Sequence, residues 1–166
     1  MKRYCFIFIF LSVTLTGYAQ EHKSIDWVRR EFLNIDTMRD IEHILEVPTS
    51  GSNPLDGDLI RAYQAAATCM KATYEFSPVS KLKYFYQGKK ELEKLIRQQK
   101  QVENVYLRLM IQLNVPGFLN YDKNIEEDLA YLHSYLPQAS LDKDYKRMML
   151  SGLKESIDDE GLKNSL

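Results

Sequence analysis

Apolar residues recur three and four positions apart along most of the chain after residue 25, which is the spacing of one face of an α-helix. Six stretches carry this pattern: residues 26–47, 55–76, 79–96, 102–115, 124–136 and 141–157. The five prolines fall between these stretches, where proline begins or ends helices. No stretch after residue 20 alternates apolar and polar positions as a β-strand does. The pattern predicts an all-α fold of about six helices arranged as antiparallel hairpins.

Residue types at the helix ends support these boundaries. Asn53 and Ser77 each precede a proline, the arrangement of an N-cap residue followed by proline at the first helical position. Asn124, with Glu127 three residues later, is typical of a capping box that opens the fifth helix. Near residues 34–36 the first stretch carries a polar interruption, where that helix can break.

Two residues inside the predicted helices are unusual for their positions. Gly88 lies within 79–96, where glycine costs about 1 kcal/mol in helix propensity, and it indicates a close crossing with a neighbouring helix. Arg108 lies in 102–115, a stretch that is apolar on nearly every side and is therefore predicted at the centre of the fold. Because a buried guanidinium requires a carboxylate, we expect a structural ion pair. The candidate partners are Glu75, Glu126, Glu127 and Asp128. The alternative is an anion-binding position that faces a groove between helices.

The first 19 residues are typical of a signal peptide. Two basic residues follow the initial methionine, residues 4–15 form an apolar run, and Gly17 and Ala19 are small residues of the kind that precede a cleavage site. We predict cleavage after Ala19 and a periplasmic or secreted protein. The apolar run is too short for a stable membrane span. Residues 20–166 are predicted to form a single α-helical domain, with a polar tail from about residue 158.

Charge and cysteine content exclude several classes of protein. The 166 residues include 22 bases and 23 acids, a net charge of −1, which becomes −3 once residues 1–19 and their two bases are removed. This balance gives no basis for nucleic-acid binding. Cys5 lies too early in the signal peptide to be the acylated cysteine of a lipoprotein. Cys69 is then the single remaining cysteine, so we expect a small buried side chain and no intramolecular disulfide.

One stretch of the chain is strongly basic. Residues 81–100 contain seven basic and two acidic side chains, with Tyr84, Phe85 and Tyr86 among them. The bases are Lys81, Lys83, Lys89, Lys90, Lys94, Arg97 and Lys100. Such a mixture can bind an anionic polymer, a lipid headgroup or an acidic partner. The simpler interpretation is a solvated outer helix face, which the acidic stretch 122–128 neutralises within the fold.

The sequence contains no recognisable catalytic constellation. It has no glycine-rich phosphate loop, dinucleotide fingerprint or nucleophile elbow. Its histidines, His22, His43 and His133, lack the second pair of ligands that a metal site needs. Adjacent acids such as Glu126 and Glu127 point to different sides of a helix, whereas paired-carboxylate catalysis requires that they converge. We therefore expect no enzyme activity, no metal site and no cofactor.

Residues 84–121 resemble the tetratricopeptide repeat (TPR) across one junction between helices. The positions that carry the resemblance are Gly88, Leu92, Leu95, Tyr106, Leu109, Met110 and Leu113. The stretch departs from the repeat at Met110, Leu113 and Lys100, where the family has Gly, Tyr and Pro. No second copy follows at the family's period of about 34 residues. The resemblance implies a right-handed TPR-like stack, and an irregular helical bundle fits the same periodicity.

The chain is also similar to a group of uncharacterised exported helical proteins of Bacteroidota. The segments that carry this likeness are FSPVSKLKYFYQGKKELEKLI and YLRLMIQLNVPGFLNYDKNIEED. It implies export and a helical fold, and it transfers no site residue.

Two hypotheses for the function follow. The first is an exported interaction module that binds another protein through a groove or face rich in Tyr and Phe. Its candidate partner-binding or anion-binding residues are Arg108, Lys83, Lys89, Lys90, Lys94 and Tyr84. The alternative is a periplasmic binder of a small amphipathic or lipid-like ligand between helices. The aromatic side chains expected around such a ligand are Tyr63, Tyr74, Phe85, Tyr106 and Phe118.

Overall fold

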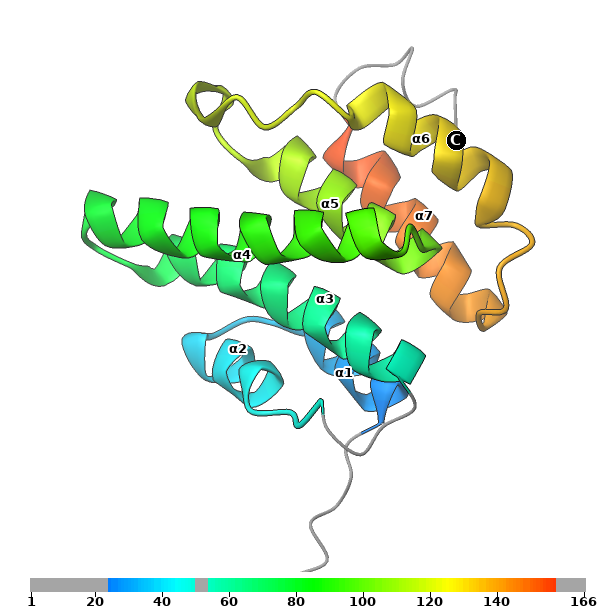
Figure 1. Cartoon of the computed structure of the whole chain (residues 1–166), viewed down its shortest axis with the longest axis horizontal. Coiled ribbons are helices and arrows are strands. Elements are labelled where there is room, and N and C mark those ends of the chain that lie inside the picture. Colours follow the sequence, from blue (N-terminus) through cyan, green and yellow to red (C-terminus); the bar gives the residue numbers. More distant parts are fainter. Residues whose placement is uncertain (1–23, 50–53, 158–166) are drawn as a thin grey trace, which may run out of the picture.

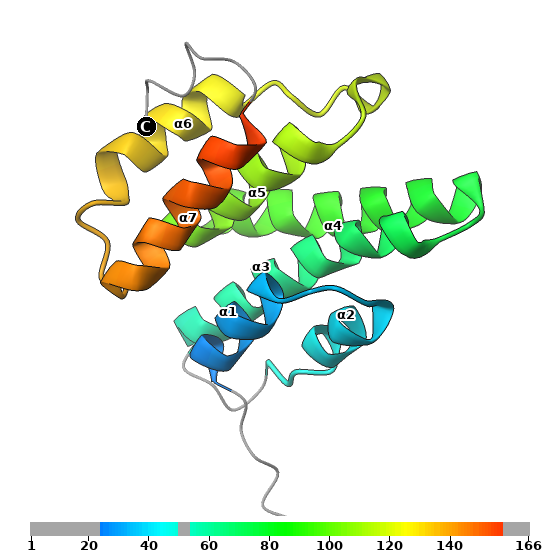
Figure 2. The same ribbon diagram turned by 180° about the vertical axis from the view of Figure 1, so that it is seen from behind.

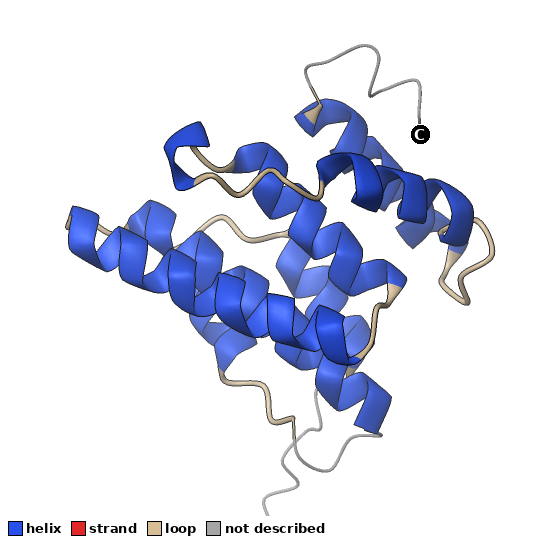
Figure 3. Cartoon of the chain, turned by 45° about the horizontal axis from the view of Figure 1, so that its top comes forward, coloured by secondary structure: helices blue, strands red, loops and turns tan. Residues whose placement is uncertain are grey.

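The protein is described here by a computed structural model that covers residues 24–49 and 54–157. Within these ranges there are seven α-helices and no strands (Figure 3), so the predicted all-α fold is confirmed. The helices are α1 (Ile25–Leu33), α2 (Met38–Leu45), α3 (Pro54–Lys71), α4 (Pro78–Gln98), α5 (Val102–Asn114), α6 (Ile125–Tyr135) and α7 (Lys143–Ser156). Two short 3-10 helices, η1 (Ala72–Tyr74) and η2 (Gly117–Leu119), follow α3 and α5. The predicted signal peptide and polar tail lie outside the described residues.

The stretch 26–47 is two helices, α1 and α2, with a break at residues 34–37 where the sequence allowed an interruption, and this raises the number of helices from six to seven. Thr37 and Asp40 start the second helix as a capping box. The Thr37 hydroxyl accepts a hydrogen bond from the backbone N–H of Asp40 (3.4 Å), and the Asp40 carboxylate accepts one from the N–H of Thr37 (2.8 Å). This reciprocal pairing satisfies two N–H groups that a continuous helix would otherwise bond internally.

Other helix starts follow the predicted chemistry in part. Ser77 caps α4, with Pro78 as its first residue. The capping box predicted for Asn124 is wrong, although α6 begins directly after it. The side-chain oxygen of Asn124 faces the Gln112 amide (3.5 Å), and its amide donates to the Glu127 carboxylate (3.4 Å). Asn53, the cap predicted for α3, lies outside the described residues.

The helices form successive hairpins. The long α3–α4 hairpin lies between α1 and α2 on one side and α5, α6 and α7 on the other (Figures 1 and 2). Helix α5 contacts α3, α4, α6 and α7, which confirms the predicted central position of this apolar helix. The odd-numbered helices are successive neighbours, because α1 contacts α3, α3 contacts α5 and α5 contacts α7.

The crossing of α3 and α4 is close at Gly88, as predicted. A Cβ atom at this position would lie 2.3 Å from the backbone oxygen of Ala65 and 2.6 Å from the sulfur of Cys69. Cys69 is itself buried at the crossing, where its thiol donates to the backbone oxygen of Phe85 (3.5 Å). Burial raises the pKa of the Cys69 thiol to about 12, so the side chain stays protonated as a small core residue.

Candidate binding groove

An apolar groove of about 560 Å³ lies between the four odd-numbered helices. The large side chains that line it are Phe32 from α1, Met70 from α3, Tyr106, Met110 and Ile111 from α5, and Met148 from α7. Helix α7 presents Gly152 to this space, and a Cβ there would lie 3.2 Å from the Tyr106 hydroxyl. Methionine side chains are flexible and polarisable, so a wall with three of them can adapt to differently shaped apolar groups.

Tyr106 supplies a polar atom within the apolar groove. Its side chain is buried, and no other described residue forms a hydrogen bond with its hydroxyl, which lies against Gly152. Burial raises the pKa of Tyr106 to about 12, so the hydroxyl remains a donor at neutral pH. Asn114 and Glu155 add further polar groups to the same lining. The groove can therefore hold an apolar group and also orient a polar one.

A second hollow, of about 570 Å³, continues between α1 and α7. Half of its lining residues are charged, among them Asp26, Arg30 and Asp142, whereas the first hollow has one charged residue, Glu155. Leu33 and Met148 line both hollows, which therefore meet at these two side chains. Together they form one composite groove, apolar at one end and charged at the other. We call it the α1–α7 groove.

Arg29 lines the charged end of the α1–α7 groove, and it is fixed there by Glu103 of α5. Its guanidinium donates to both oxygens of the Glu103 carboxylate (2.8 and 2.6 Å). The Tyr63 hydroxyl donates to the same carboxylate (2.7 Å), and the Tyr63 and Tyr145 hydroxyls form a hydrogen bond with each other. Burial and the Glu103 charge raise the pKa of Tyr63 well above its ordinary value. This cluster joins α1, α3, α5 and α7 beneath the groove.

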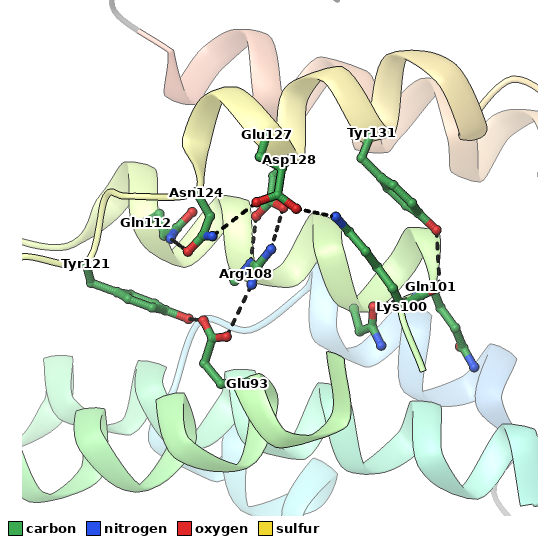
Figure 4. Close-up of polar contacts among 11 residues, drawn as sticks. Glu93, Lys100, Gln101, Arg108, Gln112, Tyr121, Asn124, Glu127, Asp128 and Tyr131 are labelled. Atoms are coloured by element: carbon green, nitrogen blue, oxygen red, sulfur yellow. Dashed lines mark hydrogen bonds and ion pairs between the residues drawn. The ribbon is translucent and has the colours of Figure 1, made fainter. Parts of the chain in front are cut away.

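Arg108 forms a second buried cluster on α5 (Figure 4). Its Nε and Nη2 donate to Asp128 of α6 (2.7 and 2.6 Å), and its Nη1 donates to Glu93 of α4 (3.2 Å). Tyr121 donates to the other oxygen of Glu93 (2.7 Å). Burial lowers the pKa of Arg108, but the two carboxylates raise it by more, so the guanidinium stays charged.

The Arg108 cluster is therefore structural. The predicted ion pair with Asp128 is present, while Glu93 was not among the candidates that the sequence suggested. All three guanidinium nitrogens of Arg108 already donate to carboxylates, and neither hollow is lined by Arg108. The alternative role in anion binding thus lacks a groove, and the charge of Arg108 is already paired with two carboxylates.

The other predicted site residues, Lys83, Tyr84, Lys89, Lys90 and Lys94, all lie on α4, and none of them lines the α1–α7 groove. Lys94 pairs with the neighbouring Glu91 (3.3 Å). The predicted neutralisation by residues 122–128 is present at the end of the basic stretch, where Lys100 pairs with Glu127 (2.6 Å). The other lysines of the set belong to a separate surface.

Of the five aromatic residues expected around a small ligand, Tyr106 alone lines the α1–α7 groove. Tyr63 and Phe85 are core residues, while Tyr74 and Phe118 face solvent. That expectation is corrected because the five lie on faces that do not converge. The sequence reasoning missed Met148 and Gly152, which are four residues apart and share one face of α7. A methionine one helical turn before a glycine was the available signal.

Comparison with known protein families, curated proteins and solved structures finds no match to this chain. In the part of the chain that the structure describes, no three His, Cys, Asp or Glu side chains are placed together to hold a metal ion. No helix in the same ranges combines the length and apolar character that a membrane span requires.

Proposed function

We propose that the protein is a TPR-like interaction module whose α1–α7 groove binds a segment of another polypeptide. The arrangement of helices supports the stack. Each hairpin (α1–α2, α3–α4 and α5–α6) contacts the next, and the first helices of successive hairpins touch one another. Such a stack exposes a continuous surface formed by alternate helices, with α7 as a final helix that covers α5.

The observation that carries the proposal is that the apolar and charged hollows meet at Leu33 and Met148. A single small ligand fills a site of about 300–1,000 Å³, whereas two adjoining hollows of about 560 and 570 Å³ extend beyond one such site. A polypeptide segment with apolar anchors at one end and charged residues at the other is complementary to the two ends of the groove. Amphipathic helices bind apolar grooves in this way.

A second candidate function is the binding of a small amphipathic ligand in the apolar end alone. The Tyr106 hydroxyl favours it, because a donor on the apolar wall that no described residue pairs suits a ligand with one polar group. In that case the charged end would make no contribution to binding.

Met148 and Tyr135 offer a pair for the test, because their side chains are 40% and 49% exposed and only Met148 lines the groove. A photo-crosslinking residue is placed at each position in turn and irradiated in the producing cell, and native mass spectrometry is applied to the purified protein. Crosslinking to a polypeptide at 148 but not at 135, abolished by Met110→Glu, supports the interaction module. A co-purifying small mass that is lost in Tyr106→Phe supports the second function. Equal crosslinking at both positions contradicts both.

Export is part of the same proposal and rests on the predicted signal peptide. The chain carrying a C-terminal tag is expected in the periplasm or medium, with an N-terminus at Gln20 when it is sequenced. A cytoplasmic chain that retains its first 19 residues would contradict export.

A further inference from the structure

The turn between α3 and α4 carries an exposed apolar patch at one end of the molecule. Phe76 is fully exposed and Val79 is 77% exposed. The large apolar side chains of this α3–α4 tip are Tyr74, Phe76, Val79, Leu82 and Tyr86. In Figures 1 and 2 the tip projects beyond the other helices, and η2 projects at the same end. Phe118 in η2 is 75% exposed. Large apolar side chains gathered at a protruding end indicate a binding surface.

The tip is amphipathic along α4. Val79, Leu82, Lys83, Tyr86 and Lys90 follow the spacing of one helical face, and all five are exposed. The opposite face of α4 is buried against the rest of the fold. The outer face of α4 therefore combines apolar and basic side chains, whereas an ordinary solvent-facing helix surface is mainly polar.

Charge at the tip is almost entirely positive. Residues 71–90 contain one acid, Glu75, and five lysines. Among the described residues no carboxylate lies within ion-pair distance of Lys81, Lys83 or Lys90. Lys71 and Lys89 lie over the rings of Tyr84 (5.1 Å) and Tyr121 (4.2 Å). The three unpaired lysines are exposed, so their charge is available to an external anion.

We propose that the α3–α4 tip docks on an anionic lipid bilayer. Its convex shape suits insertion into a planar interface, where Phe and Tyr enter the headgroup region and lysines contact acidic lipids. The second exposed aromatic group on η2, at the same end, fits one flat surface better than it fits a narrow peptide. This surface is separate from the α1–α7 groove, so membrane docking and the proposed function can be tested independently.

The test measures sedimentation of the whole chain, purified as the host processes it, with vesicles of two compositions. One is phosphatidylcholine alone, and the other contains about one quarter phosphatidylglycerol. We expect binding to the anionic vesicles at about 0.1 M salt and its loss at about 0.5 M. Each lysine near such a surface contributes about fivefold to binding, so Lys83→Gln with Lys90→Gln is expected to weaken it about 25-fold. Phe76→Ser is expected to weaken it about tenfold or more.

The matched control is Lys143→Gln with Lys154→Gln, which removes the same charge from exposed positions on α7. It is expected to leave vesicle binding within about twofold, and all variants are expected to keep the native melting temperature because the altered side chains are exposed. Three results would overturn the proposal. The first is equal binding to the two vesicle compositions, and the second is an equal loss of vesicle binding in the two double variants. The third is a chain that binds polyglutamate but neither kind of vesicle. The last would assign the surface to an acidic polypeptide.

Discussion

Gly88→Ala tests the close crossing of α3 and α4. The added Cβ would lie 2.3 Å from the backbone oxygen of Ala65, whereas ordinary contacts begin near 3.4 Å. One helix must therefore move by about 1 Å relative to the other, against backbone atoms that have no alternative rotamer. Overpacking of this kind typically costs about 1–3 kcal/mol, and the rigid obstruction places it at the upper end. The gain in helix propensity from Gly to Ala offsets about 1 kcal/mol. We expect a net loss of about 2 kcal/mol.

Urea denaturation followed by circular dichroism measures this loss, and thermal melting should show a decrease of about 4–8 °C. Gly152→Ala in α7 is the control, because its Cβ would meet only side-chain atoms, the Tyr106 hydroxyl at 3.2 Å and Met110 Cε at 3.8 Å. That variant gains the same propensity and is expected to be at least as stable as the wild type. If Gly88→Ala were as stable as Gly152→Ala, α3 and α4 could not approach each other as closely as the 2.3 Å distance requires.

Three further outcomes are expected. Gln112→Leu should keep or raise the urea midpoint, because the buried Oε1 of Gln112 has no partner among the described residues and its amide makes one long contact, with the Asn124 oxygen (3.5 Å). Asn104→Leu should instead lower stability by about 1–3 kcal/mol, since Asn104 hydrogen-bonds Gln99 and Gln101. In a Cys5→Ser chain, Cys69 should not react with Ellman's reagent at about pH 8 until denaturant is added; rapid native reaction would contradict its burial. Hydrogen bonds from Thr37 and Asp36 hold the pKa of Asp40 below its ordinary value. They therefore stabilise the fold fully at pH values above that ordinary pKa, and this stabilisation is lost as the pH falls through the lowered pKa. The drop in urea midpoint between pH 5 and pH 3 should therefore be smaller in Asp40→Asn than in the wild type.

Helix positions were largely predictable because local chemistry determines them. Proline at the first position of α3 and α4 is unfavourable inside a helix and favourable at its start, so sequence alone located both. The close approach at Gly88 was predictable for a related reason. Glycine destabilises the interior of a helix, so its presence there indicates a compensating contact, such as close packing against another helix. The role of Asn124 was not predictable, because its capping oxygen has a competing partner, Gln112, that is distant in sequence.

The candidate site was much less predictable than the helices. The α1–α7 groove depends on the distance between α1 and α7, and no residue pattern within either helix predicts that distance. Arg108 shows the same limit in part. Its need for a carboxylate followed from burial, but the contribution of Glu93 required the placement of α4 beside α5. The lysines of α4 were visible in the sequence, while their separation from the groove depends on the stacking of hairpins.

The two ionic clusters on α5 also determine how that helix is rotated about its own axis. A helix that is apolar on nearly every side can turn without changing much of the area it buries, so shape alone leaves its orientation poorly determined. Glu103 and Arg108 are five residues apart, which separates them by about 140° around the axis. A rotation by one residue would take both charges away from Arg29 and Asp128 at once, and each unpaired buried charge would cost several kcal/mol. The ion pairs of these two oppositely charged side chains thus fix the rotation of α5 about its axis, and they keep the Tyr106 face of α5 directed toward the groove.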